Sequence, residues 1–511
     1  MKRVRGRGRV RKRVRIGAPD PSLTGISGVA ALAEFIEKLD LVGRLDRGIG
    51  AIKERERGAT GGQVLVSLAQ CQLLGGDVLA ALDRQRQDVA GSALSAVPVL
   101  ASTTAAGLAR RFGPAQLAGL ESAVADLTGH AVGLLPASRR AVLAAAVTVD
   151  LDSTDVEVYG PTKQGVAYNY HGQRAGRPHL GTWAEAGLTL AAELLAGNED
   201  VRPRAADLLR RTLAGIPEDI RFAAADWDRL RVRADAGYFT ADLAHAAVEA
   251  GCDFAIAAKR NTAMWRAYAA IPEDAWGAAA SGMPGAQVAA VDYAPQGWPP
   301  HTYTIVRRVR IEAEDISGDP RSRRRRTIET NQLALALEGA ASHAHAVSFI
   351  VTNIPANDHP ANPTEPAEPA EPAEPAEPAE PAEPAEPGEA AAPVASITQV
   401  ESWFRRRTDI EDRIREAKLG AALRHLPSGD HAINTVWMWA ALLAGNISVL
   451  LQALTGIDQR HRAHGARLRH ELLCVPARIV RHGRQLILRL PPDRQLLPTV
   501  LARIRALPTA A

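Results

Sequence analysis

Two aspartates at the end of a short apolar stretch are the first residues whose types and spacing could carry chemistry. Residues 146–154 read Ala-Val-Thr-Val-Asp-Leu-Asp-Ser-Thr, an alternating, β-branched run that predicts a strand ending in a carboxylate. Side chains alternate along a strand, so Thr148, Asp150 and Asp152 are expected on one face. A strand that brings acids to its carboxyl end is a common start of a metal-dependent nuclease core. The alternative, from this stretch alone, is an edge strand with solvated aspartates.

A second acid ends a later predicted strand. Residues 230–237 read Leu-Arg-Val-Arg-Ala-Asp-Ala-Gly, which predicts a strand that delivers Asp235 just before a glycine turn. The other elements expected nearby are strands at 165–170, 188–195 and 253–259 and helices at 204–213 and 241–250. Three strands, helix, strand, helix, strand is the order of the ribonuclease-H-like fold, in which acids from the first and fourth strands meet at adjacent strand ends. We therefore expect an α/β protein with a ribonuclease-H-like core.

A charged helix over 403–418 could complete such a site. At about 100° per residue, the residues that fall within about 60° of one another on one helix face are Phe404, Arg407, Glu411 and Lys418. That face presents an aromatic ring, a guanidinium, a carboxylate and an ammonium group. A surface helix held by salt bridges is the alternative.

Composition and charge point to a protein that binds a polyanion. The 511 residues are 46% hydrophobic, which is ordinary for a globular chain, and the net charge is +4. Residues 1–16 carry nine Lys/Arg and no acid, and further basic clusters lie at 321–326 and 460–489. Such separate clusters suggest nucleic acid, although solvated faces could explain any one of them. Three distant cysteines offer neither zinc spacing nor a disulfide framework, which favours a reducing cytosol. The apolar segment 435–454 is interpreted as a buried helix, so no membrane partner is expected.

The chain divides by composition into several regions. The expected boundaries are a basic disordered arm over 1–20, an all-helical DNA-binding domain over 21–140, the first part of the core over 141–260, a β-rich insertion over 261–356, a Glu-Pro-Ala spacer over 357–396, the second part of the core over 397–457 and a basic C-terminal region over 458–511. Proline at every third residue forbids helix interior and sheet in the spacer. In the helical domain, Ser102–Thr104 predicts a cap for a helix over 105–112 that ends in Arg110 and Arg111, and this helix could enter a DNA groove. A plain helical bundle is the alternative.

These motifs resemble those of a known enzyme family. The spacing of Phe404, Arg407, Glu411 and Lys418 is similar to the Tyr-(2)-Arg-(3)-Glu-(6)-Lys signature of cut-and-paste DDE transposases of bacterial insertion sequences, with phenylalanine in place of tyrosine. The segments that resemble the insertion-sequence family numbered thirteen-eighty are Asp-Ser-Thr at 152–154, Val-Tyr-Gly at 158–160, Gly-x-x-Tyr-Asn at 165–169, Arg-Ala-Asp-Ala-Gly-Tyr-Phe at 233–239 and the run from Pro476 to Leu490. The resemblance spans roughly residues 20–490, apart from the Glu-Pro-Ala tract.

The resemblance implies a catalytic triad of Asp152, Asp235 and Glu411, with Asp150 as the rival for the first position. An all-carboxylate site suits two Mg²⁺ or Mn²⁺ ions, which prefer oxygen ligands. Members of such families hold DNA phosphates with the signature Arg and Lys, here Arg407 and Lys418, and stack a tryptophan of the insertion on a flipped base. Trp298 is the candidate for that role, with Trp265 and Trp276 as rivals.

The implied function is therefore a transposase that cleaves its element ends and joins them to target DNA. The expected partners are double-stranded DNA (terminal inverted repeats and target) and a second copy of the chain in the DNA complex, in a bacterial cytoplasm at the nucleoid. The alternatives are an inactive DNA-binding remnant and a ribonuclease-H-like nuclease that only hydrolyses DNA. His171 and His179 are expected to be structural or surface residues.

Overall fold

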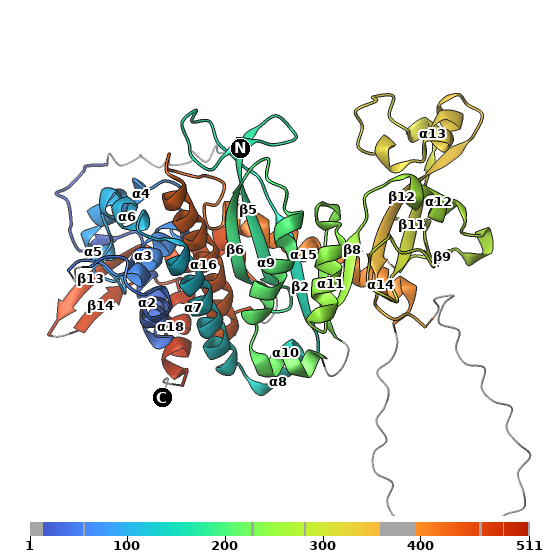
Figure 1. The fold of residues 1–511 in the computed structure, drawn as a ribbon. Helices are drawn as coiled ribbons and strands as arrows, with labels where there is room; N and C mark the ends of the chain where they lie inside the picture. The colour runs from blue at the N-terminus through green and yellow to red at the C-terminus, as the bar shows by residue number, and fades with distance from the viewer. Residues whose placement is uncertain are drawn as a thin grey trace, which may run out of the picture.

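A computed structural model describes residues 14–54, 57–225, 229–280, 283–357, 395–458, 462–483 and 485–508. The strands of the described part are β1 (Leu23–Thr24), β2 (Val147–Ser153), β3 (Val156–Glu157), β4 (Ala167–Tyr168), β5 (Arg174–Trp183), β6 (Leu188–Ala196), β7 (Leu230–Ala234), β8 (Asp253–Ala257), β9 (Gly277–Ala278), β10 (Ala286–Val291), β11 (Tyr303–Glu312), β12 (His343–Thr352), β13 (Ala477–His482) and β14 (Gln485–Arg489). Most of them form one mixed sheet that crosses the molecule (Figure 1).

The helices cover both ends and both faces of this sheet. Those before the first long strand are α1 (Val29–Lys38), α2 (Leu41–Ile49), α3 (Gly61–Leu73), α4 (Ala81–Gln87), α5 (Val89–Ser92), α6 (Ser102–Ala109), α7 (Pro114–Gly133) and α8 (Ala137–Ala144). Those that follow are α9 (Arg202–Ala214), α10 (Glu218–Ala225), α11 (Ala241–Glu249), α12 (Thr262–Ala269), α13 (Thr330–Leu337), α14 (Ile397–Arg405), α15 (Thr408–Leu419), α16 (His431–Thr455), α17 (Gly465–Leu468) and α18 (Leu496–Ala506). Short helical turns complete the chain at η1 (Ala236–Tyr238), η2 (Glu273–Ala275), η3 (Ala313–Asp315), η4 (Arg325–Thr327) and η5 (Arg469–Leu473).

Five strands give the sheet its central topology. Their order is β6-β5-β2-β7-β8, in which β5 runs antiparallel to β2 and β6 while β2, β7 and β8 are parallel. Because α9 and α10 connect β6 to β7 and α11 connects β7 to β8, the chain follows the order that the sequence predicted for a ribonuclease-H-like fold. The mixed α/β architecture with its large mixed sheet agrees with that expectation.

The second strand of the core lies where the sequence did not predict it. The expected strand at 165–170 is only the two-residue β4, and the long strand is β5, which pairs with β2 on one side and β6 on the other. The prediction was wrong because β5 contains a proline and two glycines, which normally mark turns. One of them, Gly181, faces α9 so closely that an added Cβ would lie 1.8 Å from Oγ1 of Thr212. Here glycine permits a helix to pack on the strand.

The β-rich region continues the core sheet instead of forming a sheet of its own. Strand β12 pairs antiparallel with β8, and β11, β10 and β9 follow in order, at the right of Figure 1. The edge of the core and the region expected as an insertion therefore share backbone hydrogen bonds. The two long strands of this region are β11 and β12, which agrees with its expected β-rich character.

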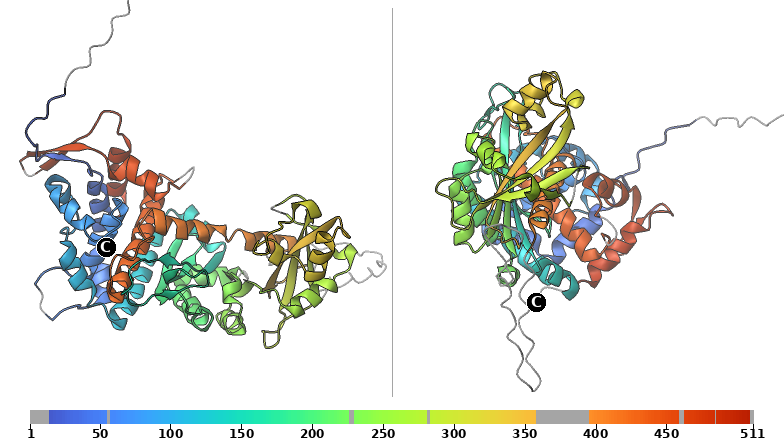
Figure 2. Two further views of the ribbon diagram at one scale, coloured as in Figure 1. Left: turned by 90° about the horizontal axis from the view of Figure 1, so that it is seen from above. Right: turned by 90° about the vertical axis from the view of Figure 1, so that its right-hand side faces the viewer.

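The core lies on the two faces of the sheet and around α16. Leu208 and Leu209 of α9 belong to the same buried cluster as Val147, Val149 and Leu151 of β2, so α9 covers one face. Helices α14 and α15, orange in Figure 2, run along the other side toward the N-terminal helices. Helix α16 is long and apolar enough to cross a membrane, but 89% of its most apolar window is buried inside the structure, as predicted for a core helix.

Two regions with unusual composition cannot be compared with the structure. The basic arm is described only from Val14 onward, and the Glu-Pro-Ala tract (365–389) lies outside the described residues. The N-terminal helices pack against α16 and α18, while β1 joins the hairpin of β13 and β14 in a separate three-stranded sheet.

A carboxylate pair at the ends of two parallel strands

The register of β2 and β7 places the two predicted aspartates side by side. Asp150 lies opposite Arg233, and Leu151 lies opposite Ala234 in this parallel pair. The next residues along the two strands are Asp152 and Asp235, at the carboxyl end where both strands stop. Because side chains alternate, Asp150, Arg233, Asp152 and Asp235 share one face of the sheet, the face toward α14.

Asp150 is neutralised by a buried ion pair. Its two carboxylate oxygens accept hydrogen bonds from Nε and Nη2 of Arg233 at 2.7 and 2.8 Å, and both side chains are almost fully buried. Nη1 of Arg233 donates to the carbonyl oxygen of Trp403 at 2.6 Å, and the guanidinium lies 5.0 Å from the centre of the Trp403 ring. The rival acid Asp150 therefore joins β2, β7 and α14 and leaves Asp152 as the acid at the strand end.

Asp152 is buried beside a second carboxylate. Burial raises the pKa of Asp152 to about 6; Arg407 opposes this rise, and the charge of Asp235 adds to it. Nη2 of Arg407 donates to Oδ2 of Asp152 at 3.1 Å, and the backbone N–H of Ser153 donates to Oδ1 at 2.7 Å. A single arginine thus balances two acids at this point.

A tyrosine that the sequence analysis gave no role lies next to the pair. Oδ1 of Asp235 accepts the N–H of Gly237 at 2.8 Å and caps the turn η1, which brings Tyr238 under the strand ends. Tyr238 is 1% exposed, and its pKa is raised well above 10, first by burial and then by the charges of Asp152 and Asp235. Its hydroxyl is therefore a neutral donor. In the sequence, the run Asp-Ala-Gly-Tyr directly after a predicted strand is the pattern that could have identified Tyr238.

The predicted single helix over 403–418 is two helices. Helix α14 ends at Arg405, and α15 begins at Thr408, so Phe404 and Lys418 do not share one continuous helical face. At the break the backbone tightens to i→i−3 hydrogen bonds, from Arg407 to Phe404 and from Ile410 to Arg407. Neither proline nor glycine marks this break, which explains why the sequence pattern did not reveal it.

The break separates the roles of the signature residues. The ring of Phe404 is 9% exposed and packs among Ile305, Ile350 and Ile354; the contact with DNA that its signature position implies stays a prediction. Arg407 turns instead toward Asp152, and Nζ of Lys418 donates to the carbonyl oxygen of Asp155 at 2.9 Å. Burial lowers the pKa of Lys418, which the charges of Asp155 and Asp152 oppose. Two cations of α15 thus lie at the end of β2.

Glu411 lies on α15 between these two cations. Its side chain is exposed, and among the described residues its carboxylate makes no hydrogen bond or ion pair. Within those residues no group of three or more His, Cys, Asp or Glu side chains is placed to hold a metal ion, so Glu411 does not close on the two aspartates in this conformation. Asp152 and Asp235 themselves fit a hard divalent cation, because they are adjacent carboxylates whose mutual repulsion a cation would relieve.

The predicted groove-binding residues lie far along the chain from this pair. Helix α6 begins at Ser102 and has Ala101 at its N-cap, so Ser102–Thr104 does not cap a helix over 105–112; Ser102 instead binds Asp83. Nε of Arg110 pairs with Asp430 at 2.9 Å, and Arg111 is exposed. The Arg110 guanidinium is thus engaged by the N-cap of α16.

The tryptophans of the β-rich region pack against other aromatic rings. Trp298 is partly buried, with its ring 5.0 Å from Phe239 and 5.7 Å from Phe254. Trp276 lies 4.1 Å below the guanidinium of Arg308, and Trp265 contacts Phe349 edge-on. Phe239 directly follows the turn η1 that Asp235 caps, so its ring contact places Trp298 next to that turn.

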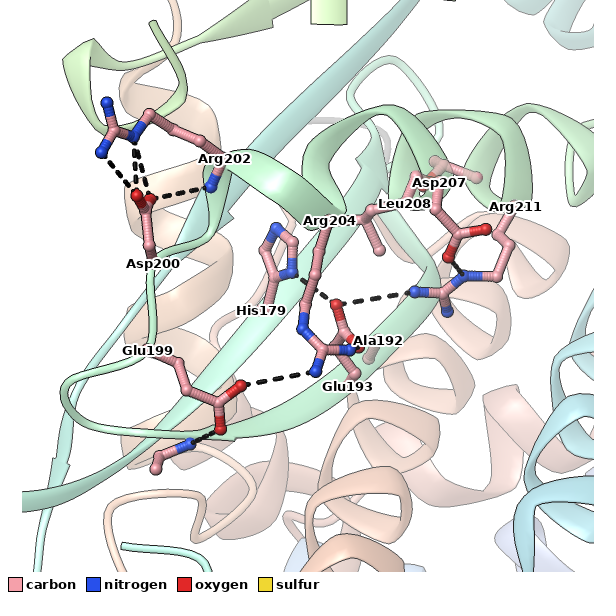
Figure 3. A network of polar contacts seen from close by, with 12 residues as sticks. His179, Ala192, Glu193, Glu199, Asp200, Arg202, Arg204, Asp207, Leu208 and Arg211 are labelled. Carbon is pink, nitrogen blue, oxygen red and sulfur yellow. Dashed lines mark hydrogen bonds and ion pairs between the residues drawn. The ribbon is translucent and has the colours of Figure 1, made fainter. Parts of the chain in front are cut away.

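The opposite face of the sheet carries a dense charge network. His179 of β5 is fully buried, and its Nδ1 lies 2.8 Å from Oε1 of Glu193, which also pairs with Arg204 and Arg211 of α9 (Figure 3). Burial alone would raise the pKa of Glu193, but the hydrogen bond and charge of His179 and the two arginines hold it below its usual range. This network joins β5, β6 and α9, so His179 is structural, as expected.

Comparison with known proteins gives a family match and similar solved structures. The sequence matches the family model described as Transposase DDE domain group 1 over residues 8–318 and 393–509. Among solved structures, it is similar to the cryo-EM structure of a piggyBac transposase synaptic complex with hairpin DNA, at 8% sequence identity and a TM-score of 0.39, over 86% of this chain and 78% of that chain. A search of curated proteins gave no match. The family match leaves out 319–392, which hold the arginines at 321–326 and the Glu-Pro-Ala tract.

Proposed function

The chain belongs to the Transposase DDE domain group 1 family, and on that premise we propose that it cuts the ends of its own mobile element and joins them to target DNA. The observation that supports the chemistry is the pair Asp152 and Asp235, two adjacent carboxylates at parallel strand ends with the pKa of Asp152 raised to about 6. We further propose that the element is a bacterial insertion sequence of the family numbered thirteen-eighty, because the motifs around Asp152, Asp235 and Glu411 resemble that family.

The acidic pair and Glu411 would hold Mg²⁺ or Mn²⁺, two ions in the proposed site. When bound, such ions supply an activated water or 3′-hydroxyl and stabilise the leaving oxygen of an in-line displacement. Asp152 and Asp235 supply oxygen ligands from the rigid sheet. Glu411 and Lys418 are seven residues apart on α15, which places them about 20° apart around the helix. Because Lys418 reaches Asp155 at the end of β2, Glu411 projects from the same side of α15.

Arg407 can bind either of two anions, the carboxylate of Asp152 or a DNA phosphate. In the DNA-free protein it binds Asp152, which balances part of the charge of the pair. We propose that Arg407 releases Asp152 and holds a DNA phosphate when cations neutralise the carboxylates, and that Lys418 holds a phosphate on the same strand. Tyr238 stays neutral beneath the pair, and its buried hydroxyl is available there as a hydrogen-bond donor. In the proposed reaction, water cleaves one strand at the element end, and the freed 3′-hydroxyl attacks the phosphodiester of the opposite strand to form a hairpin, as in similar transposases. Water then opens the hairpin, and the 3′-hydroxyl attacks a phosphodiester of the target DNA, which releases a 3′-hydroxyl of the target strand.

A DNA-binding remnant that does not cut is the second candidate. Glu411 is exposed and not grouped with the two aspartates, which favours this reading. The same DNA-binding partners apply to both candidates, so only cleavage separates them.

The test compares two neighbouring carboxylates on α15. Glu411→Gln keeps the shape of the side chain but removes its charge, and Asp412→Asn does the same to an exposed acid that pairs with Arg415. The substrate is a duplex that carries the terminal repeat read from the DNA flanking the gene, with Mg²⁺ or Mn²⁺. Cleavage should fall by several orders of magnitude in Glu411→Gln and stay near wild type in Asp412→Asn, while both bind the duplex as wild type does. Binding without cleavage by the wild type would establish the remnant instead. Equal cleavage by all three would remove Glu411 from the site.

A further inference from the structure

The hairpin formed by β13 and β14 is an exposed basic ribbon far from the carboxylate pair. It stands at the left of Figure 1, while β2, the strand of Asp152, is labelled near the centre of the molecule. Residues 477–490 contain four arginines and one histidine and no acid. Of its described arginines, Arg478, Arg481 and Arg489 are all exposed. A ribbon of this charge and exposure is expected to meet an anion.

The register of the hairpin places like charges directly opposite each other. Arg478 lies across from Arg489, and both belong to the face that also carries His482. Like charges in directly opposed positions destabilise a strand pair. Arg478 is partly balanced by Asp20 at 2.5 Å, whereas Arg489 makes no ion pair among the described residues. The Arg478–Arg489 position therefore carries a like-charge repulsion that an external anion would relieve.

The tip of the ribbon is apolar as well as basic. Leu486 and Ile487 are 46% and 41% exposed, and Ile487 pairs with Val480 between the basic positions. The pair His482–Gln485 leaves a two-residue loop that contains Gly483 with φ of +60°, so the two strands stay close together to their tip. Five paired residues give the ribbon a length of about 17 Å along its strands. The major groove of DNA is about 12 Å wide and admits a two-stranded ribbon.

The base of the ribbon is fixed to the rest of the protein. Thr24 and Leu23 pair with Ala477 and Arg478, and the N–H of Ile479 donates to Ser22. The neighbouring Gly28 lies so close to the chain before the hairpin that an added Cβ would be 1.9 Å from the carbonyl oxygen of Leu472. An exposed hairpin on a firmly held base can present its side chains in one orientation.

The base also brings the two ends of the chain together. The N-terminal residues that pair with the hairpin follow directly on 1–16, which carry nine Lys/Arg and no acid. Arg478 of the hairpin pairs with Asp20, 458 residues earlier in the sequence, so the described N-terminal segment lies beside the hairpin at the upper left of Figure 2.

We propose that the β13–β14 hairpin is a second DNA-binding element, which inserts into the major groove of duplex DNA away from the cut site, with Arg481 and Arg489 on phosphates or base edges. The proposal rests on the proposed function, because it assigns a further contact to the same DNA. It differs from the predicted groove helix α6, whose Arg110 is engaged by Asp430. The hairpin is the better candidate because its described arginines other than Arg478 are free of acidic partners.

The experiment compares two double variants of the full-length protein that lose the same charge. Arg481→Ala with Arg489→Ala removes the proposed contacts, and Arg202→Ala with Arg210→Ala removes two exposed arginines of α9 that have acidic partners. For each protein, the affinity for a random-sequence duplex of about 40 base pairs is measured from low to moderate salt. The slope of log Kd against log salt should fall by about 2 in the hairpin variant and remain unchanged in the α9 variant, since each lost phosphate contact removes about 0.9.

Stability and oligomeric state complete the test. Arg489→Ala should leave the melting temperature unchanged or raise it, because a like-charge pair is removed; a fall would indicate a structural role and overturn the proposal. If the wild type binds DNA and the hairpin variant shows the same salt slope, the hairpin proposal is also overturned, while the proposed function stands. A variant that keeps the slope but loses a dimer in sedimentation would assign the hairpin to a second copy of the chain. A wild type that binds no duplex at all would instead overturn the proposed function.

Discussion

Replacing Asp150 and Asp152 one at a time should separate the structural acid from the proposed catalytic one. Asp150→Asn leaves the buried guanidinium of Arg233 without its carboxylate, and breaking such a buried pair typically costs about 3–5 kcal/mol. Asp152→Asn has the opposite sign. A pKa of about 6 in place of 3.8 means that ionising Asp152 in the folded, metal-free protein costs about 3 kcal/mol. That cost disappears in the variant, less the value of the lost bond to Arg407.

The pH dependence of the free energy of unfolding shows whether ionised Asp152 stabilises or destabilises the folded protein. Because the folded-state pKa of Asp152 is raised, its contribution to stability is fully present below about pH 4 and is lost as the pH rises through about 6. Urea unfolding with EDTA at pH 4.5 and 7.5 measures this. The free energy of unfolding of Asp152→Asn relative to wild type should increase by about 2 kcal/mol between the two pH values, because about 1 of the 3 kcal/mol is already lost at pH 4.5. Asp150→Asn should be destabilised at both.

Cleavage of an element-end duplex completes the comparison. Asp152→Asn should lose cleavage although it is as stable as wild type, whereas Asp150→Asn should lose activity only to the extent that it unfolds. Asp412→Asn, on the exposed side of α15, is the control for an acid without either role. The reasoning fails if Asp152→Asn is destabilised by more than Asp150→Asn at pH 7.5, or if it retains full cleavage.

Three further predictions concern the parts that hold the site in place. Glu401→Leu should destabilise the protein by about 3–5 kcal/mol, because Arg307 then lacks its buried partner, and adding Arg307→Met should recover most of the loss in thermal unfolding. Deleting 365–389 should change cleavage by less than about tenfold, because a tract with no apolar face adds nothing to a core; a larger fall in the same assay would contradict this. Arg407→Ala should weaken both duplex binding and cleavage, in contrast to Glu411→Gln, and unchanged binding in a gel-shift titration would rule out its phosphate contact.

The sequence predicted the order of the core better than the position of each strand. Alternation revealed β2 and β7 because one face of each strand holds mainly β-branched or apolar residues. It missed β5, since that strand is covered on both faces and accommodates α9 through Gly181. Close packing between elements decided this case, and a local pattern carries no record of what packs against it.

The helix that carries Glu411 shows a different limit. The helical period of 3.6 residues correctly predicted a helix over most of 407–418. It did not predict the tightened turn between α14 and α15. That turn sends Phe404 into an apolar cluster and Arg407 toward Asp152, two environments that one helical face would not provide. Partners from distant strands select the break, so it could not be read from the segment itself.

The choice between Asp150 and Asp152 follows from a contrast between two equivalent positions. Two residues apart on the same strand face, one acid lies opposite Arg233 and the other beside Asp235. The inner position is fully neutralised and buried, as stability requires. The outer position brings two like charges together at the strand ends, beside Arg407 and Lys418, although an arginine or apolar residue at 235 would remove the repulsion. A locally unfavourable arrangement beside a satisfied one of the same geometry indicates a site kept for chemistry, since uncompensated charge is found where function requires it.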